Sequence, residues 1–167
     1  MSHKLLEAKW DSGTSIISIE HSLIISKEIK FLLIDVDGTL IPRTDSIIHS
    51  LVKEWVIEAK KYFKIHLVSN NPSRKRIKHI AKQLDLSFTF RAGKPGTRAI
   101  LKYINEINAK VEEVAIIGDR IFTDVLAGNR IGIYTILVNP IDSNTKQNIS
   151  SKTRMIENII ANVLGAF

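Results

Sequence analysis

The stretch Phe31-Leu32-Leu33-Ile34-Asp35-Val36-Asp37-Gly38-Thr39-Leu40 decides the fold of this chain. It is a short apolar run that ends in two carboxylates two residues apart, followed by Gly-Thr. A buried strand made of this run would carry both acids to its C-terminal end, the edge where parallel sheets place their chemistry. Because unpaired charge is costly to remove from water, the two acids predict a partner, and a metal ion is a natural one.

Strands and helices alternate along the chain after this stretch. Apolar runs predict five strands, at 31–34, 64–68, 86–90, 114–117 and 134–138. Apolar residues at helical spacing predict helices at 46–62, 72–84, 96–109 and around 125–128, with Asp45 or Ser46 as the first N-cap. This alternation predicts an α/β fold in three layers, with a doubly wound, mostly parallel five-stranded sheet covered on both faces.

The length of 167 residues predicts a single domain. We expect an N-terminal extension over 1–30, a catalytic core over 31–140, and a C-terminal loop and amphipathic helix over 141–167. Both ends carry apolar residues that are expected to cover the sheet, because a doubly wound sheet must bury its faces. Contact of either end with lipid is the alternative.

The composition indicates a basic protein, with 24 Lys and Arg against 17 Asp and Glu and a net charge of +7. This balance favours anionic partners (phosphate esters, an acidic membrane surface or nucleic acid) or reflects a solvated basic surface. The absence of cysteine excludes disulfides and thiolate metal sites. No membrane-spanning run or signal peptide is visible, so we expect a cytoplasmic protein that is able to sit on the inner face of a membrane. The sequence does not indicate an oligomeric state.

Distinctive polar residues follow four of the predicted strands. They are Asp35 and Asp37, Ser69, Lys94, and Asp119 with Asp124. Each has an ordinary explanation when taken alone: a helix cap, a loop lysine, a turn residue or an acid at a helix start. Their joint placement just after strands favours a shared site.

These residues fall into four motifs: Asp35-Val36-Asp37-Gly38-Thr39, Val68-Ser69-Asn70-Asn71, Lys94-Pro95, and Gly118-Asp119 with Asp124. Together, and in this order, the motifs resemble the haloacid dehalogenase-like (HAD) phosphatase superfamily. The resemblance implies that Asp35 is a nucleophile that becomes an aspartyl-phosphate. It implies that Asp37 acts as general acid and then as general base.

The same resemblance assigns the remaining roles. Ser69 and Lys94 would hold phosphoryl oxygens, and Thr39 and Asn70 would contact the substrate. Mg²⁺ would be ligated by Asp35, Asp119 and the carbonyl of Asp37, with Asp124 in the outer shell or bound through water.

The spacing of the motifs leaves no room for a cap domain. Asp37 and Ser69 are 32 residues apart, and Ser69 and Lys94 are 25 apart, enough in each case for one helix and one strand. The site is therefore expected to be open, which suits proteins, nucleic-acid ends or lipid headgroups as substrates.

Further stretches resemble the cap-less subclass IIIA branch that contains the mitochondrial-type phosphatidylglycerophosphatases. They are Gly118-Asp119-Arg120, Thr123-Asp124-Val125-Leu126, Gly128-Asn129-Arg130 and Thr135-Ile136-Leu137-Val138. Gly38 departs from many members, which have Asn there. The branch removes the terminal phosphate of phosphatidylglycerophosphate, an anionic phospholipid headgroup.

Six basic residues after strand ends are expected to ring the site or to be solvated loop charges: Arg43, Arg74, Lys75, Arg76, Arg91 and Arg120. Of these, Arg43, Arg91 and Arg120 are the predicted substrate contacts.

Two competing hypotheses remain open at this point. One is a phosphatase of the same chemistry that acts on a soluble phosphomonoester, a nucleic-acid end or a phosphoprotein, or that transfers phosphate to an acceptor other than water. The other is a non-enzymatic basic module that binds nucleic acid. The intact set of acids and the absence of clustered aromatic residues argue against the second.

Overall fold

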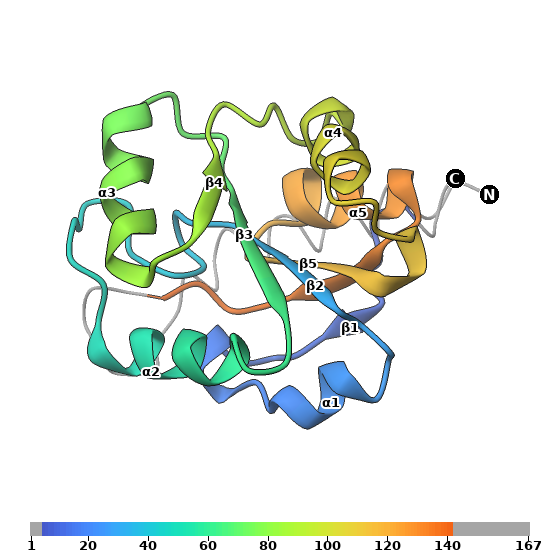
Figure 1. The fold of residues 1–167 in the computed structure, drawn as a ribbon, viewed down its shortest axis with the longest axis horizontal. Helices are drawn as coiled ribbons and strands as arrows, with labels where there is room; N and C mark the ends of the chain where they lie inside the picture. Colours follow the sequence, from blue (N-terminus) through green and yellow to red (C-terminus); the bar gives the residue numbers. More distant parts are fainter. Residues whose placement is uncertain (1–4, 142–167) are drawn as a thin grey trace.

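The computed structural model describes residues 5–141, in which six strands form one parallel sheet. The strands are β1 (Trp10–Asp11), β2 (Phe31–Ile34), β3 (Lys64–Val68), β4 (Ser87–Thr89), β5 (Val114–Gly118) and β6 (Tyr134–Leu137). Their order across the sheet is β1-β6-β5-β2-β3-β4 (Figure 1). The predicted α/β fold with a parallel sheet is confirmed, with six strands in place of five. The predicted C-terminal helix lies outside the described residues.

Helices cover both faces of the sheet. They are α1 (His21–Ile25), α2 (Ser50–Ala59), α3 (Arg74–Leu84), α4 (Arg98–Glu106) and α5 (Leu126–Ile131), with short turns η2 (Ile16–Ser18), η3 (Val111–Glu113) and η4 (Ile121–Val125). Leu32 and Ile34 of β2 pack in one cluster with η2, α1, α2 and α3. Leu33 between them packs in a second cluster with α4 and α5. Alternate residues of the central strand therefore serve opposite layers.

The N-terminal segment is built into this core. The two residues of β1 pair with Ile136 and Leu137 of β6. Ile16, Ile19 and Ile24 are buried, and the indole N–H of Trp55 donates to the carbonyl of Ile19 at 2.9 Å. A strand of two residues has no apolar run to reveal it, which is why the sequence pattern predicted only five strands.

Helix α2 begins later than predicted. His49 is its N-cap, and the ring accepts a hydrogen bond from the N–H of Leu51 at 3.3 Å. The Gln83 side chain accepts from the Ile48 N–H at 3.0 Å and donates to the Ser46 carbonyl at 2.8 Å. These two bonds hold 46–48 outside the helix, so the prediction of Asp45 or Ser46 as N-cap was wrong. No helix within residues 5–141 is both long enough and apolar enough to cross a membrane.

Candidate active site

The carboxyl ends of β2, β3 and β5 meet at one edge of the sheet. Ile34 pairs with Leu67 on one side and with Ile117 on the other. The ladder continues one residue further, where the N–H of Asp35 donates to the carbonyl of Ile117 at 2.9 Å. A cavity of about 290 Å³ opens at this edge and is lined by Asp35, Asp37, Arg43, Ser69, Asn70, Asn71, Lys94, Arg120 and Thr123.

Lys94 is the buried cation of the site. Its Nζ donates to Asp35 Oδ1 at 2.7 Å, to Asp124 Oδ1 at 2.6 Å and to the Val68 carbonyl at 2.7 Å. All three ammonium protons therefore have acceptors. Burial alone lowers the pKa of Lys94, but the carboxylates of Asp124 and Asp35 outweigh it and raise the pKa above its ordinary value. Lys94 is thus a fixed positive charge beside Asp35.

Three carboxylates gather beside Lys94. One oxygen from each of Asp35, Asp119 and Asp124 lies within 4.8 Å of the others. Burial raises the pKa of Asp35 to about 6 despite the opposing charge of Lys94. Burial, together with the charges of Asp35 and Asp124, raises the pKa of Asp119 to about 7. The cluster holds more negative charge than Lys94 neutralises.

The fit of this cluster to a metal ion rests on Asp119. Its Oδ1 is buried and accepts no hydrogen bond from the described part of the chain. A buried carboxylate oxygen without a donor is costly, and a cation with oxygen ligands satisfies it. The close packing extends to Gly38, where a Cβ would lie 2.5 Å from Asp119 Oδ2. Gly38 also has φ +101°, which side chains rarely adopt. Asp35, Asp119 and Asp124 therefore fit a divalent cation.

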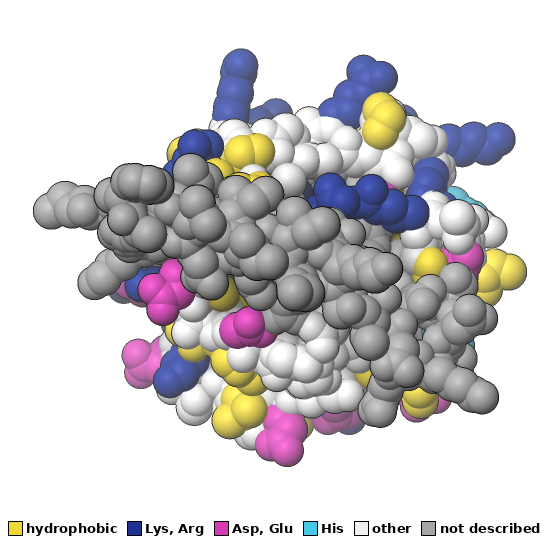
Figure 2. All heavy atoms as spheres, turned by 180° about the vertical axis from the view of Figure 1, so that it is seen from behind, with side chains coloured by type: hydrophobic (Ala, Val, Ile, Leu, Met, Phe, Trp, Pro, Cys, Tyr) yellow, Lys and Arg dark blue, Asp and Glu magenta, His cyan; other side chains and the backbone are white. Residues whose placement is uncertain are grey.

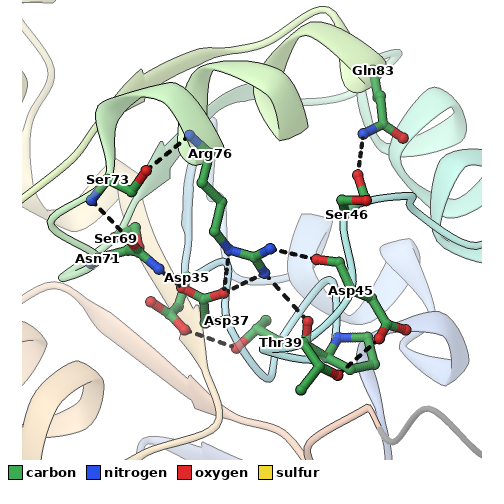
Figure 3. A network of polar contacts seen from close by, with 12 residues as sticks. Asp35, Asp37, Thr39, Asp45, Ser46, Ser69, Asn71, Ser73, Arg76 and Gln83 are labelled. Carbon is green, nitrogen blue, oxygen red and sulfur yellow. Dashed lines mark hydrogen bonds and ion pairs between the residues drawn. The ribbon is translucent and has the colours of Figure 1, made fainter.

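Asp37 faces away from this cluster, toward helix α3 (Figure 3). Its Oδ1 accepts from Nε of Arg76 at 3.2 Å and from Nη2 at 2.8 Å, and its Oδ2 accepts from Asn71 Nδ2 at 2.8 Å. Arg76 also donates to the carbonyls of Asp45 and Pro42. The arginine therefore fixes the Asp37 carboxylate and the loop after it together.

Asn70 positions the Lys94 loop. Its Nδ2 donates to the Lys94 carbonyl at 2.7 Å, and its Oδ1 accepts from the Lys94 N–H at 2.8 Å. Ser69 is 1% exposed, and its Oγ accepts from the Asn71 N–H at 3.1 Å. The second motif therefore both lines the cavity and locks the third motif in place.

The structure brings most of the predicted site residues together. Seven line the cavity: Asp35, Asp37, Ser69, Asn70, Lys94, Arg43 and Arg120. Asp119 and Asp124 join Asp35 in the acidic cluster. The structure does not bring Thr39 or Arg91 to the cavity wall. Thr39 is completely buried with its hydroxyl 3.5 Å from Asp35 Oδ2, and Arg91 is exposed in the turn after β4.

Three residues at the site had no specific role in the sequence-based prediction. Asn71 and Thr123 line the cavity, and Arg76 binds Asp37. Asn71 and Thr123 lie inside stretches that carried the family resemblance, which is the signal that could have marked them. Arg76 was one of six basic residues expected near the site, but its contact with a carboxylate 39 positions away follows from packing.

Comparison with known proteins identifies the family. Residues 14–142 match the family model for mitochondrial PGP phosphatase. The chain belongs to this family. A probable phosphatase, YqeG of Bacillus subtilis (strain 168), is 34% identical over 131 residues, which make up 78% of this chain and 76% of that protein. The predicted membership in the cap-less HAD-like phosphatases is confirmed.

Solved structures share the fold at low sequence identity. An uncharacterized protein from Listeria monocytogenes serotype 4b superposes with a TM-score of 0.57 at 15% identity, over 74% of this chain and 88% of that chain. The cobalt-bound deoxy-D-mannose-octulosonate 8-phosphate phosphatase of Haemophilus influenzae gives a TM-score of 0.50 at 16% identity, over 83% and 91%. At these identities the likeness concerns the fold alone.

Proposed function

We propose that this chain is a Mg²⁺-dependent phosphatase that converts phosphatidylglycerophosphate to phosphatidylglycerol through an aspartyl-phosphate. The arrangement around Asp35 carries the proposal. Lys94 binds this carboxylate, and one oxygen from each of Asp119 and Asp124 lies within 4.8 Å of one of its oxygens. Asp37 shares the same cavity. Family membership supports the phosphatase chemistry and the lipid substrate.

The reaction has two steps in which Asp35 and Asp37 have separate roles. In the first, a carboxylate oxygen of Asp35 attacks phosphorus and the bond to the ester oxygen breaks. Asp37 gives its proton to the departing alkoxide. In the second step a water molecule attacks phosphorus and gives a proton to Asp37. The Asp35–phosphorus bond then breaks, which releases inorganic phosphate and restores the carboxylate.

The remaining residues stabilise charge and position the substrate. Ser69 holds a phosphoryl oxygen, and Lys94 holds one by exchanging one of its three present acceptors for it. The Lys94 charge also reduces the repulsion between Asp35 and Asp124. Asp35, Asp119 and the carbonyl of Asp37 would hold a Mg²⁺ ion, with Asp124 in the outer shell or bound through water, and the bound ion would further neutralise phosphoryl charge. Arg43 and Arg120 at the cavity wall suit the second, diester phosphate of the lipid.

The lipid substrate is supported by the open, basic character of the site. The β2–β3 connection contains only α2, and the β3–β4 connection only α3, so no inserted domain covers the cavity in the described residues. A site without an inserted cap domain can reach a headgroup that remains in its bilayer. The proposal places the enzyme at the inner face of a membrane as a peripheral protein.

Phosphate release from phosphatidylglycerophosphate in vesicles tests the proposal. The assay is run with Mg²⁺ and then with a chelator, beside soluble phosphomonoesters, a 5′-phosphorylated oligonucleotide and a phosphopeptide. We expect Mg²⁺-dependent release from the lipid and a loss of more than about 10⁴-fold in Asp35→Asn, with no phosphoenzyme and an unchanged fold. Hydrolysis of soluble esters alone would overturn the lipid substrate. An active Asp35→Asn protein would overturn the mechanism.

A further inference from the structure

Helix α3 presents one strongly basic face to solvent. Its sequence is RKRIKHIAKQL, with no acidic residue. Ile77, Ile80, Ala81 and Leu84 are buried on the sheet side. The exposed residues are Arg74, Lys75, Lys78, His79 and Lys82. Arg74, Lys78 and Lys82 recur every four residues and therefore lie along one side of the helix. We call the five exposed residues Arg74, Lys75, Lys78, His79 and Lys82 the α3 basic face.

The charges of the α3 basic face, those of Arg74, Lys75, Lys78 and Lys82, form no ion pair in the part of the chain that the structure describes. Two of them, Arg74 and Lys75, lie in the first turn, where the helix dipole makes positive charge unfavourable. Lys82 lies in the last turn, where a cation complements the dipole, but fold stability gives no reason for Arg74 and Lys75, so an external anionic partner is the better explanation for them.

The α3 basic face lies beside the cavity. Arg76, in the first turn of α3, binds Asp37, and Asn71, three residues before the helix, lines the cavity wall. In Figure 1, α3 lies along the left side of the molecule, and in the view from behind most visible Lys and Arg side chains project from the upper part of the molecule, while Asp and Glu lie mainly lower (Figures 1 and 2). An extended anionic surface that contacts α3 would therefore meet the cavity as well.

An exposed apolar side chain belongs to the same region. Ile47 is 73% exposed. Its segment is tied to the last turn of α3 by the two hydrogen bonds of Gln83. Basic side chains combined with a projecting aliphatic side chain suit the interface of an anionic bilayer, where charge meets headgroups and the aliphatic group enters the apolar boundary.

We propose that the α3 basic face, with Ile47, docks the protein on an anionic phospholipid bilayer and brings the cavity to the headgroups. This inference rests on the proposed lipid substrate and adds the surface that recognises the membrane. It assigns a role to charges that do not take part in the chemistry.

Vesicle binding tests the docking surface separately from turnover. The vesicles contain phosphatidylglycerol and phosphatidylcholine, or phosphatidylcholine alone, and no phosphomonoester, so the result does not depend on the phosphatase reaction. We expect binding only to the anionic vesicles, weakening as salt is raised. The triple variant Lys75→Gln/Lys78→Gln/Lys82→Gln should bind about 100-fold more weakly, because each charge near such a surface contributes about fivefold.

The control variant removes the same charge from the opposite edge of the sheet. Lys27, Lys64 and Lys110 are exposed and lie near the amino ends of β2, β3 and β5. The triple Lys→Gln variant at these positions should lose less than about threefold in binding. An equal loss in both triple variants would show that net charge alone drives binding and would overturn the assignment to α3. Failure of the wild-type protein to bind anionic vesicles would overturn docking itself, whatever the hydrolysis assay shows.

Ile47→Ser separates a bilayer from a nucleic acid as the partner. Loss of an inserted aliphatic group should weaken vesicle binding by about fivefold and leave binding to a DNA duplex unchanged. If the protein binds the duplex more tightly than the vesicles, and Ile47→Ser affects neither, the α3 basic face is a nucleic-acid surface and the bilayer assignment is wrong.

Discussion

Asp35 and Asp37 are two residues apart, but they lie in different surroundings. Asp35 faces into the protein, where it meets the buried Lys94 and the other two acids of the cluster. Asp37 faces the rim, where Arg76 and Asn71 hold it. The side chains of Asp37 and Arg76 are 14% and 20% exposed, whereas that of Lys94 is 1% exposed.

The difference fits the two chemical roles proposed for this strand end. The proposed nucleophile, Asp35, must stay ionised and fixed, and a buried cation holds it there. The proposed general acid, Asp37, must exchange protons with substrate and water, and it lies at the rim, held by Arg76 of helix α3. We call Asp35, Ser69, Lys94, Asp119 and Asp124 the inner region, and Asp37 with Arg76 and Asn71 the rim region. Substitutions in the inner region are therefore expected to lower both stability and activity, and substitutions in the rim region mainly activity.

Replacement of Lys94 should produce the largest effect on the inner region. In Lys94→Met, Asp35 and Asp124 face each other without a cation, since Lys94 binds both. Loss of one partner from a buried ion pair costs about 3 to 5 kcal/mol. We expect a decrease of this size in the free energy of unfolding, measured in denaturant without metal, together with loss of turnover.

Two further variants show whether the buried charge is the cause. Lys102→Met removes an exposed lysine whose ion pair with Glu106 spans 3.8 Å, and it should change stability by less than about 0.5 kcal/mol. Adding Asp35→Asn to Lys94→Met removes one of the opposed carboxylates and should restore part of the stability. A double variant no more stable than Lys94→Met would mean that lost packing, and not charge, explains the result.

Replacement of Arg76 should affect the rim region selectively. If Arg76 acts by positioning Asp37 as the acid, Arg76→Gln should lower kcat/KM, which reports on the first step, most for esters whose leaving group needs a proton. We expect about a 100-fold decrease for an alkyl phosphate and less than about tenfold for 4-nitrophenyl phosphate, whose leaving group is stable as an anion.

The controls for Arg76 separate positioning from folding. Arg76→Lys keeps the charge without the fork and should recover part of the activity on the alkyl ester. Adding Arg76→Gln to Asp37→Asn should cause no further loss if both act in one step. Arg98→Gln removes an exposed arginine of α4 as a matched change. Equal losses of kcat/KM on both esters would assign Arg76 a structural role only.

The inner region was more predictable from the sequence than the rim. Asp35, Ser69, Lys94 and Asp119 each follow a strand, and parallel strands bring their carboxyl ends to one edge whatever the details of packing. The fold class followed from the same alternation. Strand ends therefore carried most of the information about the inner site.

Features that depend on tertiary contacts were not predictable in this way. The two residues of β1 show no pattern, and Gln83 shortens α2 through bonds made 35 and 37 positions away. Thr39 is the last residue of the first motif, but its side chain is buried in the core. Arg76 was one of six basic residues expected near the site, and its sequence position does not distinguish it from the others. The packing of α3 beside the loop at 42–45 is what places Arg76 against Asp37.

His66 is a buried titratable group that, unlike Lys94, has no charged partner among the described residues. It lies on β3 and is 4% exposed, with ring nitrogens 2.7 Å from Ser87 Oγ and 2.9 Å from Thr89 Oγ1. Its ring stacks on Tyr103 at a centroid distance of 3.8 Å. Where Lys94 has two carboxylates, His66 has only hydroxyl partners. Burial lowers the pKa of His66 to about 4.

The smallest expected effect is on the pH dependence of stability through His66. Because its folded pKa of about 4 is below the ordinary 6.5, the neutral ring stabilises the fold above pH 6.5, and this contribution is lost as the pH falls toward 4. The raised pKa values of Asp35 and Asp119 act in the opposite direction when no metal is bound, because they stabilise the fold as the pH falls.

His66→Gln isolates the contribution of His66. We expect wild-type protein to lose on the order of 2 kcal/mol relative to His66→Gln between neutral pH and about pH 4.5, measured by denaturant unfolding with chelator. His79→Gln controls for the loss of a histidine, and parallel wild-type and His66→Gln curves would show that protonation of His66 carries no such cost.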